Sequence, residues 1–350
     1  MTRRALATAI VLAAPLAGCP DETGTGGAGG TGGEAPSAPA WQVVFDGDPI
    51  DRSLLSIWGA SSKSVYAVGG PLGNSGFEAL AIHFDGAVWR DLHAGGDRSF
   101  WWVHGTSDSD VWMVGEDGRI THWDGAAFVE HDAGTAATLY GVVAFAPNDV
   151  WAVGGTVGDP GVLDDVVLRF DGAAWSPVAL PQALGRVHFK VWGTSSDDLF
   201  IVGEAGLIWH KRGADWQLEP ETPVATGTLT TVHGCSASDV YAVGGRDVLH
   251  YDGASWAKLD RPLTNDVNGV FCGAGVGLVG MGGLKQRYDG VAWADDFVAD
   301  PHGDLHAVWQ DDTGAFWAVG GDFIVGPKPG VKRDGIVTRY GPGTVPAVLE

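Results

Sequence analysis

Histidine is the residue type in this chain whose recurrence first suggests metal chemistry, because imidazole is a common zinc ligand. Four histidines share one position of a repeated phrase: His83, His122, His210 and His250. Arginine takes that position in three other copies: Arg169, Arg287 and Arg339. Side chains that recur once per repeat are spread along a repeat protein and do not converge on one ion. We therefore predict that these histidines are structural and that the chain has no metal site.

Carboxylates are the next candidates, because Asp and Glu together number 43. A glycosidase needs two carboxyl groups at a defined separation, and no isolated pair stands out in the sequence. Serine-nucleophile motifs and phosphate-binding loops are also lacking. We therefore predict no catalytic residue and no cofactor. Asp159, Asp164 and Asp165 lie in one acidic segment that either holds Ca²⁺ or, as we favour, is a solvated loop.

The N-terminus has the layout of an export signal. Arg3 and Arg4 precede an apolar run over residues 5–15, which is too short to span a bilayer. The following Leu-Ala-Gly-Cys, which ends at Cys19, resembles the lipobox of bacterial lipoprotein signal peptides. That resemblance implies cleavage before Cys19 and attachment of lipid to it. The alternative is an ordinary secretory peptide with an incidental cysteine.

Composition divides the chain into three parts. We expect a lipoprotein signal peptide over 1–18, a lipidated Cys and Gly-rich flexible linker over 19–40, and a folded body over 41–350. The protein would then be exported and held by its lipid at the cell envelope, on the outer membrane or the cell surface. The membrane contact is expected through the N-terminal lipid alone.

Cys235 and Cys272 are the other cysteines, and they fall near equivalent ends of the same strand in two successive repeats. Export favours a disulfide between them. The inner strands of neighbouring repeats, however, usually lie farther apart than the Cα separation of about 7 Å that a disulfide permits. A disulfide and two free thiols both remain open.

A self-similar phrase sets the architecture of the body. Its centre is an apolar run that ends in Val-Gly, and the valines mark seven copies: Val68, Val114, Val153, Val202, Val243, Val279 and Val319. Their spacing of about 40 residues is typical of the blades of a β-propeller. The 55 glycines and 16 tryptophans fit many short strands joined by tight turns.

Each copy predicts a small antiparallel sheet of four strands. In the fifth copy, the second strand is expected over 240–243, the third over 248–251 and the fourth from Trp256. An Asp-Gly pair between the third and fourth strands predicts a two-residue turn in which both residues have positive φ. Aspartates recur between the first and second strands and are expected to bond turn amides: Asp110, Asp149, Asp198 and Asp239.

The last copy lacks its fourth strand, because residues 341–350 contain no tryptophan. The missing strand is found at the other end of the body, where Trp41 within 40–44 matches Trp256 of the fifth copy. We predict an all-β fold, a seven-bladed β-propeller of four-stranded antiparallel blades, closed by the N-terminal strand that completes the last blade.

The fifth copy, Val-Tyr-Ala-Val-Gly-Gly followed by His-Tyr-Asp-Gly-Ala-Ser-Trp, resembles a kelch repeat. The shared features are the double glycine and an aromatic residue with a following tryptophan, here Tyr251 and Trp256. Glu116 and Glu204 depart from the double glycine, and the gap before the tryptophan is shorter than in kelch repeats. The Asp-Gly-x-x-Trp segment is also similar to the Asp-box of sialidase-like propellers. These resemblances imply a kelch-like or WD40-like propeller and leave the function open.

The net charge and the lengths of the links between strands limit which partners the protein can bind and where. A net charge of -22 argues against a nucleic-acid partner. The longest predicted links open on one face, and loops carry binding more often than scaffold strands do. We expect the ligand site on this face and its central funnel. Trp101 and Trp102 either contribute there or, as we favour, pack in the core.

Taken with the export signal, these features predict a monomeric, membrane-anchored binding or scaffold protein that recognises a polysaccharide or an envelope protein. The alternative is a glycan-active hydrolase or lyase on a propeller scaffold, and a third interpretation is a plain structural spacer.

Overall fold

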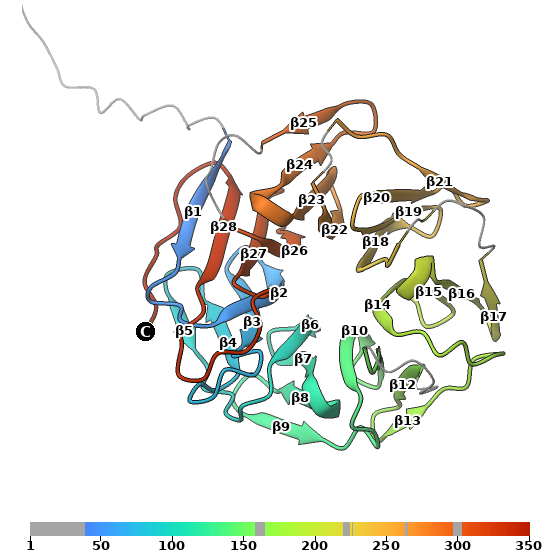
Figure 1. Ribbon diagram of the computed structural model, residues 1–350, viewed down its shortest axis with the longest axis horizontal. Helices are drawn as coiled ribbons and strands as arrows, with labels where there is room; N and C mark the ends of the chain where they lie inside the picture. The colour runs from blue at the N-terminus through green and yellow to red at the C-terminus, as the bar shows by residue number, and fades with distance from the viewer. Residues whose placement is uncertain (1–38, 158–164, 220–224, 226, 263–264, 297–302) are drawn as a thin grey trace, which may run out of the picture. The chain divides into compact units, whose positions relative to one another are not determined.

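The described strands form seven four-stranded antiparallel sheets arranged around a central axis (Figure 1). Inner strands of successive sheets contact each other, and the last contacts the first, so the ring is closed. The all-β, seven-bladed prediction is therefore confirmed. No helix in the described part is long and apolar enough to cross a membrane. The structure, a computed structural model, describes residues 39–157, 165–219, 225, 227–262, 265–296 and 303–350.

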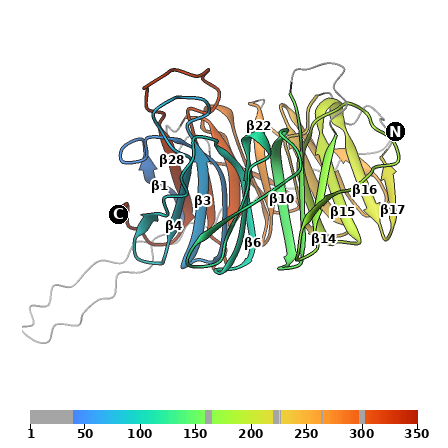
Figure 2. The same cartoon turned by 90° about the horizontal axis from the view of Figure 1, so that it is seen from below.

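In the first six blades the chain runs from an inner strand on the axis to an outer strand, and in the seventh the outer strand is β1. The strands run between the two faces of the ring (Figure 2). The inner strands are β2 (Ser53–Ser61), β6 (Phe100–Ser107), β10 (Thr138–Ala146), β14 (His188–Ser195), β18 (Thr231–Ser236), β22 (Val267–Cys272) and β26 (Leu305–Gln310). The second strands are β3 (Ser64–Gly70), β7 (Asp110–Gly115), β11 (Asp149–Gly155), β15 (Asp198–Gly203), β19 (Asp239–Gly244), β23 (Val276–Gly280) and β27 (Phe316–Gly321).

The third and fourth strands are shorter on average and lie farther from the axis. The third strands are β4 (Leu80–Phe84), β8 (Ile120–Trp123), β12 (Val166–Phe170), β16 (Ile208–Arg212), β20 (Asp247–Tyr251), β24 (Lys285–Tyr288) and β28 (Gly335–Gly341). The outer strands are β5 (Trp89–Asp91), β9 (Phe128–His131), β13 (Trp175–Pro177), β17 (Asp215–Leu218), β21 (Trp256–Lys258), β25 (Trp293–Asp295) and β1 (Ala40–Asp46).

Burial of the second strand explains the apolar centre of the repeat, and all of β3 is buried. The glycine that follows the repeat valine is required by close packing. A Cβ on Gly69 would lie 2.0 Å from the backbone oxygen of Ser53, and the equivalent glycines of the other blades have the same contact at 2.0 or 2.1 Å. The next position accepts Glu116 and Glu204, because there the chain enters a short 3-10 turn: η1 (Glu116–Gly118), η2 (Glu204–Gly206) and η3 (Met281–Gly283).

The N-terminal strand completes the seventh blade, as predicted. β1 pairs antiparallel with β28, and Trp41 lies opposite Tyr340 in the register that Trp256 and Tyr251 have in the fifth blade. The indole nitrogen of Trp41 donates a hydrogen bond of 3.1 Å to Asp296, just after β25. Strands from the two ends of the body therefore share one sheet.

The C-terminal residues 345–350 add a second closing contact that the repeat pattern did not predict. The backbone nitrogen of Trp89 donates to Val348, and Trp89 accepts from Glu350, each at 2.9 Å, so the tail lies parallel to β5 of the first blade. Leu349 packs against the core between the first and seventh blades, where Trp89 is fully buried.

The link between third and fourth strands differs from the predicted two-residue turn. In the first blade it has four residues, 85–88. Only Gly86 has a positive φ, 91°, and the Asp85 carboxylate accepts hydrogen bonds of 2.9 Å from the two backbone amides after the glycine. Arg212 replaces this aspartate in the fourth blade, where the link is shorter. Aspartate is thus used here as an acceptor for turn amides.

Candidate functional site

The four repeat histidines bond within four different blades, so they do not converge on one point. Three donate to the aspartate that begins the second strand: His122 to Asp110 (2.8 Å), His210 to Asp198 (3.0 Å) and His250 to Asp239 (2.8 Å). The fourth, His83, lies 2.9 Å from the hydroxyl of Ser64. Each imidazole also lies over an aromatic ring of the second strand, with centroids between 3.8 and 4.7 Å apart.

These partners correct one prediction. The aspartates between first and second strands were expected to bond turn amides, and the structure shows them accepting from side chains instead. Asp110 also accepts from the indole nitrogen of Trp112 at 3.0 Å, and Asp149 accepts from Arg169 at 3.0 Å. In these four blades the carboxylate therefore joins the start of the second strand to the third strand.

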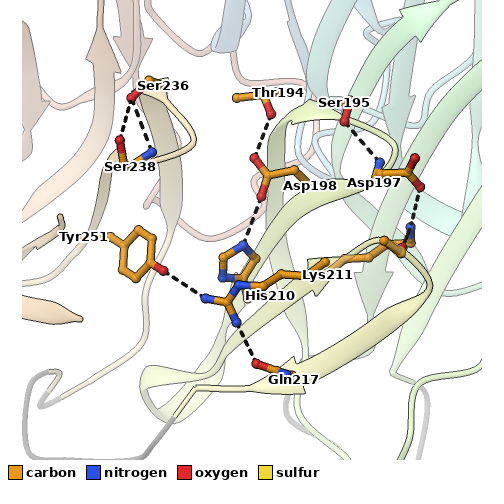
Figure 3. A network of polar contacts seen from close by, with 12 residues as sticks. Thr194, Ser195, Asp197, Asp198, His210, Lys211, Gln217, Ser236, Ser238 and Tyr251 are labelled. Atoms are coloured by element: carbon orange, nitrogen blue, oxygen red, sulfur yellow. Dashed lines mark hydrogen bonds and ion pairs between the residues drawn. The ribbon is translucent and has the colours of Figure 1, made fainter. Parts of the chain in front are cut away.

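Figure 3 shows the fullest of these networks, in the fourth blade. Thr194 donates to Asp198 at 2.7 Å, and Asp198 in turn accepts from His210. Arg212 reaches the next blade through a hydrogen bond of 2.9 Å to the hydroxyl of Tyr251. These hydrogen bonds hold the strands of the fourth blade together and join it to the fifth.

The structure joins Cys235 and Cys272 in a disulfide, with their Cα atoms 5.1 Å apart. The ends of β18 and β22 therefore approach more closely than inner strands were expected to. Asp239 lies near both sulfur atoms, but disulfide sulfurs are not thiolates and its carboxylate bonds His250. A metal site does not follow from this group.

Several predicted site residues lie outside the described residues: Cys19, Asp159 and Asp164. The remaining acid of that segment, Asp165, accepts a hydrogen bond of 3.0 Å from the backbone nitrogen of Arg186 and another from Leu184. Asp165 therefore holds the link that leads into β14.

The long links between second and third strands lie on the same face as the links between blades, which we call the long-link face. On it, segments 71–79 and 322–334 are fastened to each other. Arg333, 3% exposed, donates to the backbone oxygens of Pro71 (2.7 Å) and Leu72 (3.2 Å). Asn74 donates to the backbone oxygen of Val331 at 2.8 Å. These two long links are therefore held in place.

The fastened link 322–334 presents apolar side chains to solvent. Ile324, Val325 and Val331 are 60%, 40% and 48% exposed, and they are three of the eight exposed large apolar side chains in the described part. We call these three residues the apolar tip. Single exposed apolar residues are ordinary, whereas interaction surfaces gather several of them in one place.

A polar hollow of about 490 Å³ lies beside the second blade, lined by 94–98, 117–119, 130–133 and Thr135. Arg119 is buried in its wall and bonds Glu130 at 3.0 Å. Charges of both signs line this hollow, so it fits a neutral polar ligand better than an ion.

A second cavity, of about 180 Å³, lies on the axis and is lined by residues from all seven inner strands. Aromatic side chains, all but one of them at the start of these strands, form an arc beside it. Trp101 contacts Tyr140 and His306, with ring centroids 5.0 and 5.9 Å apart, and Phe189 and Phe323 extend the arc. Because cavity residues come later in the same strands, the arc lies between the cavity and the long-link face.

Trp101 and Trp102 thus lie in different surroundings. Trp101 packs in the arc, whereas Trp102 lines the axial cavity and faces the ammonium of Lys190, whose nitrogen lies 4.0 Å from the ring centroid. The repeat pattern did not identify Lys190 or Arg333. A signal for Lys190 was present, since the structurally equivalent inner-strand positions carry other residues: Ser56, Trp102, Gly141, Thr231, Gly269 and Ala307.

Comparison with solved structures identifies the architecture. A structure of YCF48 bound to D1 peptide matches with a TM-score of 0.64 and 16% identity, over 87% of this chain and 99% of that chain. The chain has the fold of a seven-bladed β-propeller. YCF48 from Cyanidioschyzon merolae matches with a TM-score of 0.62 and 12% identity, over 86% and 98% of the two chains. The WD40 propeller domain of Doa1 matches with 0.65 and 9% identity, over 87% and 97%.

Identity this low shows the fold alone. No protein-family model and no curated protein sequence matches the chain. The kelch-like subtype stays a prediction from the repeat.

Proposed function

We propose that this chain is an exported, lipid-anchored binding protein that recognises a segment of another envelope protein through the long-link face. The observation that carries the proposal is the apolar tip on link 322–334, held by Arg333 and Asn74. A loop fixed before binding loses little conformational entropy when a partner covers it. Apolar side chains there gain free energy from the water they release.

Two further observations support a protein partner. YCF48, which has the same architecture, has a structure with a bound peptide. This chain carries a net charge of -22, so basic residues beside an apolar docking segment would speed its encounter with the propeller. Lipid on Cys19 and the linker over 19–40 would hold the ring near the membrane while letting it reach partners.

A polysaccharide is the second candidate ligand, and the polar hollow beside the second blade favours it. Its volume of about 490 Å³ lies within the usual range of small-ligand sites. A glycan would be expected there and not at the apolar tip, so the two candidates place the ligand at different residues.

The test uses the full chain as bait in envelope extract. Wild type is compared with Ile324→Ser/Val325→Ser/Val331→Ser, and with Val291→Ser as a matched control. Val291 is 90% exposed and lies on the link between β24 and β25, on the opposite face. We expect the triple variant to lose a partner protein that wild type and Val291→Ser both capture. Capture of the same proteins by all three would reject the protein-partner proposal, and glycan-array binding abolished by Arg98→Ala would support a polysaccharide in the polar hollow.

A further inference from the structure

Lys190 is a buried cation in the axial cavity, 3% exposed. Its ammonium donates a hydrogen bond of 2.6 Å to the backbone oxygen of Tyr140 and faces the ring of Trp102 at 4.0 Å. An ammonium has three donors, and one carbonyl and one ring face satisfy it only in part. Burial of a charge without an opposite charge is costly.

No carboxylate among the described residues is paired with Lys190. Burial alone lowers the pKa of its ammonium to about 7. Near neutral pH, a nearby negative charge would therefore decide whether the Lys190 ammonium keeps its proton. An anion that entered the cavity would supply the missing partner and raise that pKa again.

The other titratable groups around Lys190 are neutral histidines. Burial lowers the pKa of His104 to about 4 and of His233 to about 3, and both line the same cavity. Burial and the charge of Lys190 lower the pKa of His306, in the aromatic arc, to about 3. Lys190 is thus the titratable cation that faces the cavity near neutral pH.

The remaining wall is largely aromatic and aliphatic, with Trp58, Trp192, Phe271 and Trp309 contributed by four different blades. A volume of about 180 Å³ would hold about six waters at ~30 Å³ each. The space fits a small molecule or one residue at the end of a chain, and not a folded partner.

We propose that the axial cavity binds a small carboxylate with an apolar body, whose carboxylate pairs with Lys190 while the body packs against the surrounding tryptophans. This site is separate from the apolar tip and does not depend on the protein-partner proposal. A free acid and the carboxyl end of a chain share this chemistry.

The first test titrates the full chain with benzoate and with benzamide, its uncharged counterpart, by calorimetry and tryptophan fluorescence. We expect benzoate to bind about tenfold or more tightly than benzamide. Lys190→Met should weaken benzoate binding about tenfold or more, whereas Lys211→Met should leave it unchanged. Lys211 is a matched control, because it is also buried and bonds the backbone of Ser196 but does not line the cavity.

The pH dependence of benzoate binding is a second test, because a lysine with a purely structural role would not change it. Benzoate binding should weaken about tenfold or more between pH 6 and pH 9, because the free ammonium loses its proton while the three histidines stay neutral throughout. Benzamide binding should not change. This arm needs wild type alone, so it decides the proposal even if Lys190→Met does not fold.

N-acetylphenylalanine and its amide, tested in the same way, distinguish the two sources of carboxylate. Binding of benzoate alone supports a free acid, and binding of N-acetylphenylalanine but not its amide supports a chain end. Equal binding of benzoate and benzamide, unchanged benzoate binding by folded Lys190→Met, or a flat pH profile overturns the proposal.

Discussion

At the scale of single residues, the third-strand position of the repeat is filled by planar side chains that donate hydrogen bonds. Six of these seven side chains lie over an aromatic ring of the second strand. The exception is Arg287, which faces Gly277 and lies over the ring of Tyr340 in the next blade. Arg169 and Arg339 have their guanidinium carbons 5.5 and 5.4 Å from the ring centroids of Trp151 and Trp317. Stacking and donation explain the four repeat histidines without a metal ion.

His210 is the most buried of these histidines, 2% exposed and 3.8 Å from the ring centroid of Phe200. His210→Ala should lower the free energy of unfolding by about 2 to 3 kcal/mol, because it opens a space and removes the hydrogen bonds of His210 to Asp198 and Glu219. His250→Ala, at the same position but partly exposed, should cost about 1 kcal/mol or less. Urea unfolding measures both, and equal losses would contradict this ranking.

At the scale of elements, the Asp-Gly links predict how stability depends on pH. Bonds from backbone amides lower the pKa of the carboxyl groups of Asp124, Asp171, Asp252 and Asp289 below their usual range. The unfolded chain therefore binds more protons than the folded one, so this stabilisation is present above about pH 4 and is lost as pH falls further.

Replacing these four aspartates by asparagine keeps an acceptor oxygen for the turn amides but removes the titrating group. The free energy of unfolding of the variant should fall less than that of wild type between pH 6 and pH 3. Parallel pH profiles for the two proteins would show that the turns do not contribute.

The disulfide between β18 and β22 is a second prediction at this scale. Cys235→Ser/Cys272→Ser should lower the free energy of unfolding by about 2 to 4 kcal/mol in non-reducing buffer. A reductant should destabilise wild type by a similar amount and leave the variant unchanged. Two alkylatable thiols at these positions in denatured, non-reduced protein would refute the disulfide.

The strands could be predicted from sequence because their causes are local. The apolar second strand and the glycine that meets the neighbouring backbone recur in each copy, so seven copies reinforce one pattern. The turn between the third and fourth strands was predicted wrongly because Asp-Gly occurs both in two-residue turns and in four-residue links. In the four-residue link the Asp85 side chain accepts hydrogen bonds from the turn amides. Similar local patterns allow different link lengths.

Contacts between distant parts of the chain were harder to predict. Arg333 donates a hydrogen bond to Pro71, more than 250 residues away, and no pattern in either segment indicates that the two are in contact. Of the long-range contacts, only the pairing of the closing strand could be predicted, because the seventh copy lacks a fourth strand and the segment around Trp41 matches one. Lys190 stood out by type, but its cavity exists only once seven inner strands surround the axis.

At the scale of the whole molecule, both ends of the folded body secure the ring. β1 completes the seventh blade, and the tail through Leu349 lies beside the first. The aromatic rings of Phe45, Trp89 and Trp317 pack where these blades meet, with centroids near 6 Å apart. The long-link face and the axial cavity are both defined by this closure, since each draws residues from the first and the last blades.

Hydrogen exchange of the full chain reports this closure without altering it. The backbone amides of β1 that donate to β28 should exchange as slowly as the amides of β28, with the free energy of global unfolding, because the two strands share one ladder of hydrogen bonds. Exchange of residues 41–45 at the rate of an unfolded segment, with β28 still protected, would show that the N-terminal strand does not close the ring.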